Sequence, residues 1–155
     1  MNPIRVKITI LNLQNRIPVA PEKIKTTVNK VLSSEGTRRK GEITLLFCDD
    51  RKIRELNREF LGKRGATDVI AFNLSEKGED KLAADIAVSA QAAERNARIF
   101  RTSPLYELHL YVAHGVLHIL GYDDRKAKDT AVMREKEETI MASLRLSQDA
   151  NHVHS

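Results

Sequence analysis

Several segments of the chain alternate hydrophobic and polar residues, which is the pattern of a strand with one buried face. Residues 5–12 carry Val6, Ile8 and Ile10 on one side and charged or polar residues on the other, which predicts a half-buried strand. The continuous apolar run within 42–48 predicts a second strand that is buried on both faces. Two further strands are expected at 68–74 and 84–89.

Apolar residues repeat every three or four positions in five other segments, and this period predicts helices. Ser103 followed by Pro104 is a strong start signal, because the hydroxyl caps backbone N–H groups and proline suits the first helical position. In the helix that begins at 51, Ile53, Leu56 and Phe60 are expected to face inward. The five helical segments are 21–34, 51–61, 90–100, 104–121 and 125–146.

Four strands and about five helices that alternate only in part predict an α+β fold. We expect a single domain in which a small mixed four-stranded sheet packs with about five helices. A chain of 155 residues is long enough for one such core and too short for two. The domain is expected to span residues 1–146, and residues 147–155 are expected to form a flexible C-terminal tail.

The composition narrows the classes of protein to which the chain can belong. Hydrophobic residues make up 41% of the chain, but no apolar run approaches the roughly 20 residues of a membrane span. The N-terminus lacks the apolar segment of a secretory signal, and Cys48 is the single cysteine, which excludes an internal disulfide and a thiolate zinc cluster. We therefore expect a cytoplasmic protein without a membrane partner. The net charge of +5 favours a polyanionic partner such as RNA.

The strongest chemical signal lies at the C-terminal end of the central predicted helix, in the segment A-H-G-V-L-H-I-L-G-Y-D-D. His114 and His118 are four positions apart, so both imidazoles share one helix face and can reach one metal ion. Gly121 suits a sharp chain reversal that returns Asp124 to the same point. Two histidines and a carboxylate predict a three-ligand metal site with an open position, as in catalytic zinc sites.

The residues around this site favour some reactions over others. The spacing parallels that of zinc peptidases, but Gly115 stands where a peptidase carries its glutamate base, so peptide hydrolysis is disfavoured. A phosphodiester suits a cationic metal and nearby basic residues. Basic residues lie in predicted loops at Arg38, Arg39, Lys40, Lys63 and Arg64, although each taken alone is an ordinary surface charge. His109 lies off the His114 stripe and is not a ligand candidate.

The segment H-G-V-L-H-I-L-G-Y-D-D resembles the histidine signature of the YbeY-type endoribonucleases. Other segments follow in the same order as in that family: T-D-V-I-A-F at 67–72, A-D-I-A-V-S at 84–89 and M-R-E-K-E-E-T-I-M at 133–141. The resemblance covers roughly residues 5–146. It implies a single-strand-specific, metal-dependent endoribonuclease that acts in maturation of the 3′ end of 16S small-subunit rRNA and in ribosome quality control.

The resemblance also implies a cofactor and partners. It implies one Zn²⁺ per chain, with another divalent transition metal as an alternative, and His114 and His118 carry over as its ligands. With Asp124 as the third expected ligand, these residues are expected to act through a metal-bound water. The implied partners are RNA, namely rRNA and the small ribosomal subunit, without specificity for DNA. Two other functions stay open: a ribosome-associated RNA-binding factor with a mainly structural metal, and a different zinc metallohydrolase.

The chain departs from the family pattern at positions that bear on the site. Asp124 stands where the family usually has a third histidine, and the adjacent Asp123 matches the family's aspartate, for which we expect a role in orienting an imidazole. Leu61 stands where the family often has arginine, so Lys63 or Arg64 is expected to position the phosphate instead.

Overall fold

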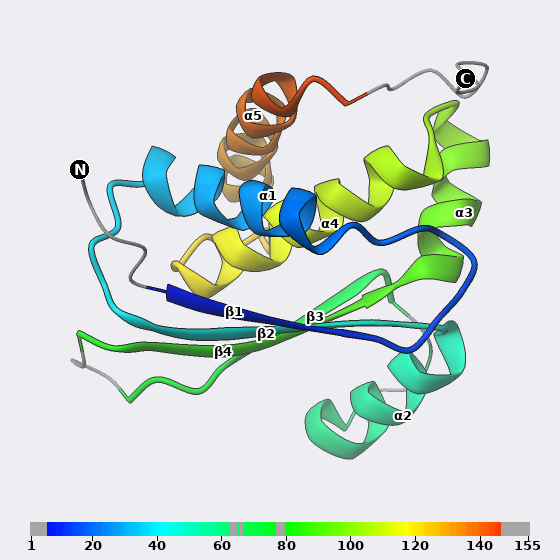
Figure 1. Ribbon diagram of the computed structural model, residues 1–155, viewed down its shortest axis with the longest axis horizontal. Coiled ribbons are helices and arrows are strands. Elements are labelled where there is room, and N and C mark those ends of the chain that lie inside the picture. The colour runs from blue at the N-terminus through cyan, green and yellow to red at the C-terminus, as the bar shows by residue number, and fades with distance from the viewer. Residues whose placement is uncertain (1–5, 63–64, 66, 77–79, 147–155) are drawn as a thin grey trace.

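The computed structural model describes residues 6–62, 65, 67–76 and 80–146 (Figure 1). The predicted tail, residues 147–155, lies outside the described residues. Along the described part the elements are β1 (Val6–Asn12), α1 (Pro21–Ser34), β2 (Gly41–Cys48), α2 (Asp50–Leu61), β3 (Val69–Asn73), β4 (Leu82–Ser89), α3 (Ala90–Phe100), α4 (Pro104–Ile119) and α5 (Ala127–Leu144). These elements confirm the predicted α+β fold. No helix within the described ranges is long and apolar enough to cross a membrane.

The four strands form one mixed sheet in the order β1-β2-β4-β3. β1 pairs with β2 and β2 pairs with β4 in parallel, whereas β3 runs antiparallel to β4. β4 follows β3 in the chain but lies between β2 and β3 in the sheet. This arrangement places β4 at the centre, where six of its eight residues are buried.

The helices cover the two faces of the sheet unequally. Figure 1 shows α1, α3, α4 and α5 on one side of the sheet and α2 alone on the other. α4 is the central helix of the thicker layer, because it contacts β3, β4, α1, α3 and α5. Ten of its 16 residues are buried, so the helix that carries His114 and His118 is held firmly by the core.

Two expectations about burial are wrong. β2 is not buried on both faces: Ile43, Leu45 and Phe47 are buried, whereas Leu46 is only partly buried on the face that α2 leaves partly open. Phe60 was expected to face inward from α2 but is 61% exposed. The cause is the same in both cases, because a single helix is too narrow to cover a four-stranded sheet.

The two ends of α4 are fixed by the residues that predict them. Ser103 Oγ accepts a hydrogen bond of 3.0 Å from the backbone N–H of Tyr106, and Pro104 occupies the first helical position. At the other end Gly121 has a φ of 110°, a conformation that favours glycine. The helix therefore stops sharply, and the chain turns back after it.

Candidate metal centre

The chain reversal after α4 brings a carboxylate back to the helix, as the sequence predicts. The backbone N–H of Gly121 donates to His118 O at 3.0 Å, and that of Tyr122 donates to Leu117 O at 3.1 Å. These bonds close the end of the helix and direct the following residues back along it. As a result, Asp124 Oδ2 lies 3.6 Å from His114 Nε2.

The distance between these two atoms has a chemical meaning. At 3.6 Å the nitrogen and the oxygen are too far apart for a good hydrogen bond. Two ligands of one tetrahedral zinc, each about 2.0–2.1 Å from the ion, lie about 3.3–3.4 Å apart. The separation of His114 and Asp124 is thus close to that of two donors to a shared ion, and an imidazole with a carboxylate is a donor set that zinc accepts.

His118 lies one turn further along α4 and has an exposed ring. Among the described residues, no three His, Cys, Asp or Glu side chains are close enough together to form a complete metal site. The structure therefore brings His114 and Asp124 together, while His118 is related to this pair only by its position one turn after His114 on α4. The donor types fit zinc, and the exposed positions of His118 and Asp124 make the site accessible from solvent.

The other nitrogen of the His114 ring is bound by a residue that the sequence analysis did not find. This residue is Glu137 of α5, whose Oε2 atom is 2.6 Å from His114 Nδ1. The Glu137 side chain is only 15% exposed. An ionised carboxylate only accepts hydrogen bonds, so Nδ1 must carry the proton. In a neutral ring Nε2 then presents its lone pair on the side where Asp124 lies. A carboxylate in this position is typical of histidines that bind metals.

A signal for Glu137 does exist in the sequence. Met133, Ile140 and Met141 are the buried residues of α5, and Glu137 lies four positions after the first and three before the second. It therefore falls on the inward stripe of the helix, where a charged residue needs a specific partner. The partner is 23 positions away in the chain, so the spacing alone does not identify it.

The electrostatic surroundings favour a proton on His114. Burial of the ring acts to lower the His114 pKa, but the hydrogen bond with Glu137 and the charges of Glu137, Asp124 and Asp68 outweigh it. The net effect raises the His114 pKa above its ordinary value. Negative charge that stabilises an imidazolium also stabilises a bound metal cation, so protons and metal compete for this position.

Asp123 does not orient the His114 ring; that position is occupied by Glu137. Asp123 Oδ1 accepts hydrogen bonds from the backbone N–H groups of Asp124 at 2.7 Å and Arg125 at 3.2 Å. Asp123 thereby shapes the turn that presents Asp124. The two expected phosphate-positioning cations, Lys63 and Arg64, lie outside the described residues.

A further contact fastens this turn to the rest of the molecule. The Tyr122 hydroxyl donates a hydrogen bond to Glu35 at the end of α1, and Lys136 Nζ of α5 lies 3.0 Å from Glu35 Oε2. Burial acts to raise the Glu35 pKa, but the bonds with Tyr122 and Lys136 outweigh it and hold the pKa below its ordinary value. Glu35 therefore stays ionised and links three elements around the turn.

The chain matches a known protein family over most of its length. The family described as Endoribonuclease YbeY matches residues 9–145 of the chain. That range includes every element from α1 to α5 and all the residues of the site described above.

Individual relatives agree with the family match. The chain is 35% identical over 149 residues to an Endoribonuclease YbeY of Pelotomaculum thermopropionicum, covering 90% of this chain and 98% of that protein. It is 39% identical over 147 residues to the Endoribonuclease YbeY of Desulforamulus reducens, covering 88% and 96%. Its fold is similar to the solution structure of TM1509 from Thermotoga maritima, with a TM-score of 0.60 and 27% identity over 88% of each chain.

Proposed function

Because the chain belongs to the YbeY endoribonuclease family, we propose that it is a zinc-dependent endoribonuclease specific for single-stranded RNA. We propose that it acts in the cytoplasm on the small ribosomal subunit, where it matures the 3′ end of 16S rRNA and takes part in ribosome quality control. In this proposal the enzyme is a hydrolase that cleaves phosphodiester bonds.

The observation that carries this proposal is the arrangement of His114. Its Nδ1 is 2.6 Å from Glu137 Oε2 and its Nε2 is 3.6 Å from Asp124 Oδ2, so the ring is oriented with its free nitrogen beside a second metal donor. His114, His118 and Asp124 would hold one Zn²⁺. A zinc ion bound there supplies Lewis acidity toward a phosphoryl oxygen and lowers the pKa of a water molecule.

The residues of the chain then position the substrate and the ligands. Glu137 keeps the proton on His114 Nδ1, and Asp123 holds the turn that carries Asp124. We propose that Lys63 or Arg64 places the scissile phosphate, since a cation near a transferring phosphoryl group stabilises its charge.

The packing of α4 argues against a peptidase. A Cβ atom at Gly115 would lie 2.8 Å from Ile86 Cγ2 of the buried strand β4. Even a Cβ there requires Ile86 to shift, and a longer side chain needs more room, so the packing disfavours the glutamate base of a zinc peptidase at this position.

The first experiment is cleavage of a labelled single-stranded RNA by the zinc-loaded protein, beside the metal-free protein and His114→Ala purified in the same way. We expect cleavage that requires both zinc and His114, with a loss of at least about a hundredfold in either control. Protein that holds one zinc per chain but cleaves no faster than His114→Ala would contradict the proposal.

His118→Ala separates a catalytic metal from a structural one. We expect this variant to lose cleavage and stay folded, because His118 is exposed on a helix whose other faces are buried. A sharp fall in Tm with RNA affinity retained would instead favour a ribosome-associated RNA-binding factor with a structural metal.

A further inference from the structure

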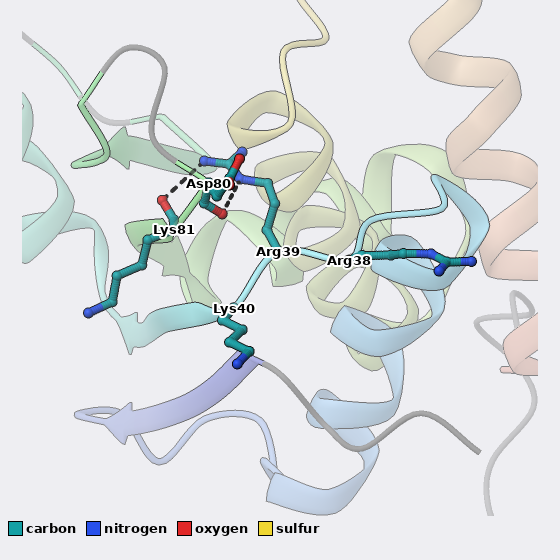
Figure 2. Close-up of a pocket in the computed structure, with 5 residues that line it drawn as sticks. All are labelled: Arg38, Arg39, Lys40, Asp80 and Lys81. Carbon is teal, nitrogen blue, oxygen red and sulfur yellow. Dashed lines mark hydrogen bonds between the residues drawn. The ribbon is translucent and has the colours of Figure 1, made fainter.

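A cluster of basic residues lies outside the metal centre, where the connection from α1 to β2 meets the start of β4. Arg38, Arg39, Lys40 and Lys81 line a pocket of about 580 Å³ together with one carboxylate, Asp80 (Figure 2). Four cations and a single anion give this surface an excess of positive charge. The pocket combines residues that are about 40 positions apart, so the fold creates it.

The backbone beneath the cluster is fixed. Arg39 Nε donates to Asp80 O and Arg39 Nη2 donates to Lys81 O, each at 3.2 Å, so this guanidinium joins the two segments. The backbone N–H of Leu82 donates to Lys40 O at 2.7 Å, and the first residues of β2 and β4 pair directly after it. The other cations therefore project from a preorganised surface, which reduces the entropy lost on binding.

Three of the cations are available to a ligand. Arg38, Lys40 and Lys81 are exposed, and none of them forms an ion pair with a described residue. Figure 2 shows that Arg38 and Lys81 extend in opposite directions, with Lys40 between them. Cations spread along a line match a row of phosphates better than one small anion, which would need donors that converge on it.

The cluster is connected to the metal centre through the end of α1. Glu35, at the C-terminal cap of α1, accepts a hydrogen bond from Tyr122, which is two residues before Asp124. Arg38 follows Glu35 by three residues, a span of at most about 11 Å. Figure 1 shows the α1–β2 connection and the C-terminal end of α4 toward the same side of the molecule.

We propose that Arg38, Lys40 and Lys81 form a phosphate-binding track for single-stranded RNA that leads to the His114–Asp124 centre. The inference rests on the proposed ribonuclease function, because that function is the reason to expect the bound RNA to run toward the His114–Asp124 centre. The track binds the backbone away from the point of cleavage, so its contacts are independent of base sequence.

The test compares the unmodified protein with the triple variant Arg38→Gln, Lys40→Gln and Lys81→Gln. The probe is a fluorescent single-stranded RNA of about 20 nucleotides, and anisotropy measures its binding at salt concentrations from about 50 to about 200 mM. We expect binding to weaken at least about tenfold at the lowest salt. The slope of log affinity against log salt should become shallower by about 2, which corresponds to three lost phosphate contacts on a single strand.

A matched control removes the same charge elsewhere. Arg51→Gln, Arg98→Gln and Arg101→Gln change three exposed cations on α2 and at the end of α3 that form no ion pair with a described residue. This variant has the same net charge as the triple variant of the track. It should keep the salt slope and bind RNA within about threefold of the unmodified protein, since net charge alone acts weakly at this ionic strength.

The outcomes separate this inference from the proposed function. If the unmodified protein cleaves RNA and the two triple variants bind it equally well, the track is wrong and the ribonuclease stands. If the protein binds RNA through these residues but zinc-loaded protein never cleaves, the track stands and the ribonuclease is wrong. If poly-L-glutamate binding, and not RNA binding, depends on the three cations, the surface recognises an acidic protein and the inference is overturned.

Discussion

The two ring nitrogens of His114 have different partners, and the difference determines what the residue can do. Nδ1 is 2.6 Å from Glu137 Oε2, and Nε2 faces Asp124 at 3.6 Å. A histidine with one nitrogen fixed by a carboxylate has a defined tautomer and a defined ring orientation, and its other nitrogen becomes more basic. Glu137 therefore affects metal binding although it is not proposed as a ligand.

Replacing Glu137 with glutamine should weaken zinc binding by about 10–100-fold, because the amide removes the charge that makes the ring a stronger donor. The measurement is a competition titration against a chromophoric zinc chelator at pH 7.5. Glu138→Gln changes the neighbouring exposed residue by the same chemistry and should leave the zinc affinity unchanged. Equal affinities for the two variants would show that Glu137 has no part in the site.

Among the residues of the candidate site, the sequence predicts those that are close together in the chain. His114, His118 and Asp124 follow from helical spacing and a glycine turn, both of which are local geometry. Glu137 was missed because its position beside His114 depends on how α5 packs against α4. The actual contacts of Asp123 depend on the path of the turn, which the sequence does not specify.

At the scale of elements, the absence of a side chain at Gly115 lets α4 approach the sheet closely. A Cβ there would meet Ile86 Cγ2 at 2.8 Å and Val69 Cγ2 at 3.4 Å. Ile86 is 1% exposed, and its β-branched side chain has few alternative χ1 rotamers in a packed core, so room for a Cβ requires a shift of this side chain or of strand β4. The glycine thus sets the distance between the sheet and the helix that carries the histidines.

Gly115→Ala should therefore destabilise the protein, although alanine is the better helix former. The gain in helix propensity is about 1 kcal/mol and the cost of overpacking a core is typically 1–3 kcal/mol, so the free energy of unfolding should fall by about 1 kcal/mol. Urea denaturation monitored by circular dichroism measures it. A variant more stable than the unmodified protein would show that β4 and α4 separate easily.

The sequence predicts most element boundaries but not the arrangement of the elements. Capping residues and prolines place the ends of α1 and α4 within about two residues, because these signals act on the local backbone. The position of β4 between β2 and β3, and the exposure of Phe60, depend on which surfaces meet after the chain folds.

For the molecule as a whole, the contact between α1 and α4 includes a buried titratable group. His109 of α4 is 2% exposed and shares a hydrogen bond of 2.7 Å between its Nδ1 and Thr27 Oγ1 of α1. Burial, with a smaller contribution from the charge of Lys23, lowers the His109 pKa to about 4. The folded protein therefore holds this ring neutral at a pH where the unfolded chain protonates it.

The sign of the resulting pH dependence follows from proton binding. Between the folded pKa of about 4 and the unfolded value of about 6.5, the unfolded chain binds more protons, so stability rises with pH. The contribution of His109 to the free energy of unfolding is complete above pH 6.5 and is lost as the pH falls toward 4. From pH 7.5 to pH 5 the loss should be about 2 kcal/mol.

The measurement is the free energy of unfolding in urea at pH 7.5 and pH 5 for the unmodified protein and for His109→Asn, whose amide does not titrate. Other groups, including His114 with its raised pKa and opposite slope, are common to both proteins, so the difference between the two pH effects isolates His109. We expect the unmodified protein to lose about 2 kcal/mol more than the variant on acidification. Parallel losses would mean that His109 is protonated inside the folded protein, and that the α1–α4 contact accommodates its charge.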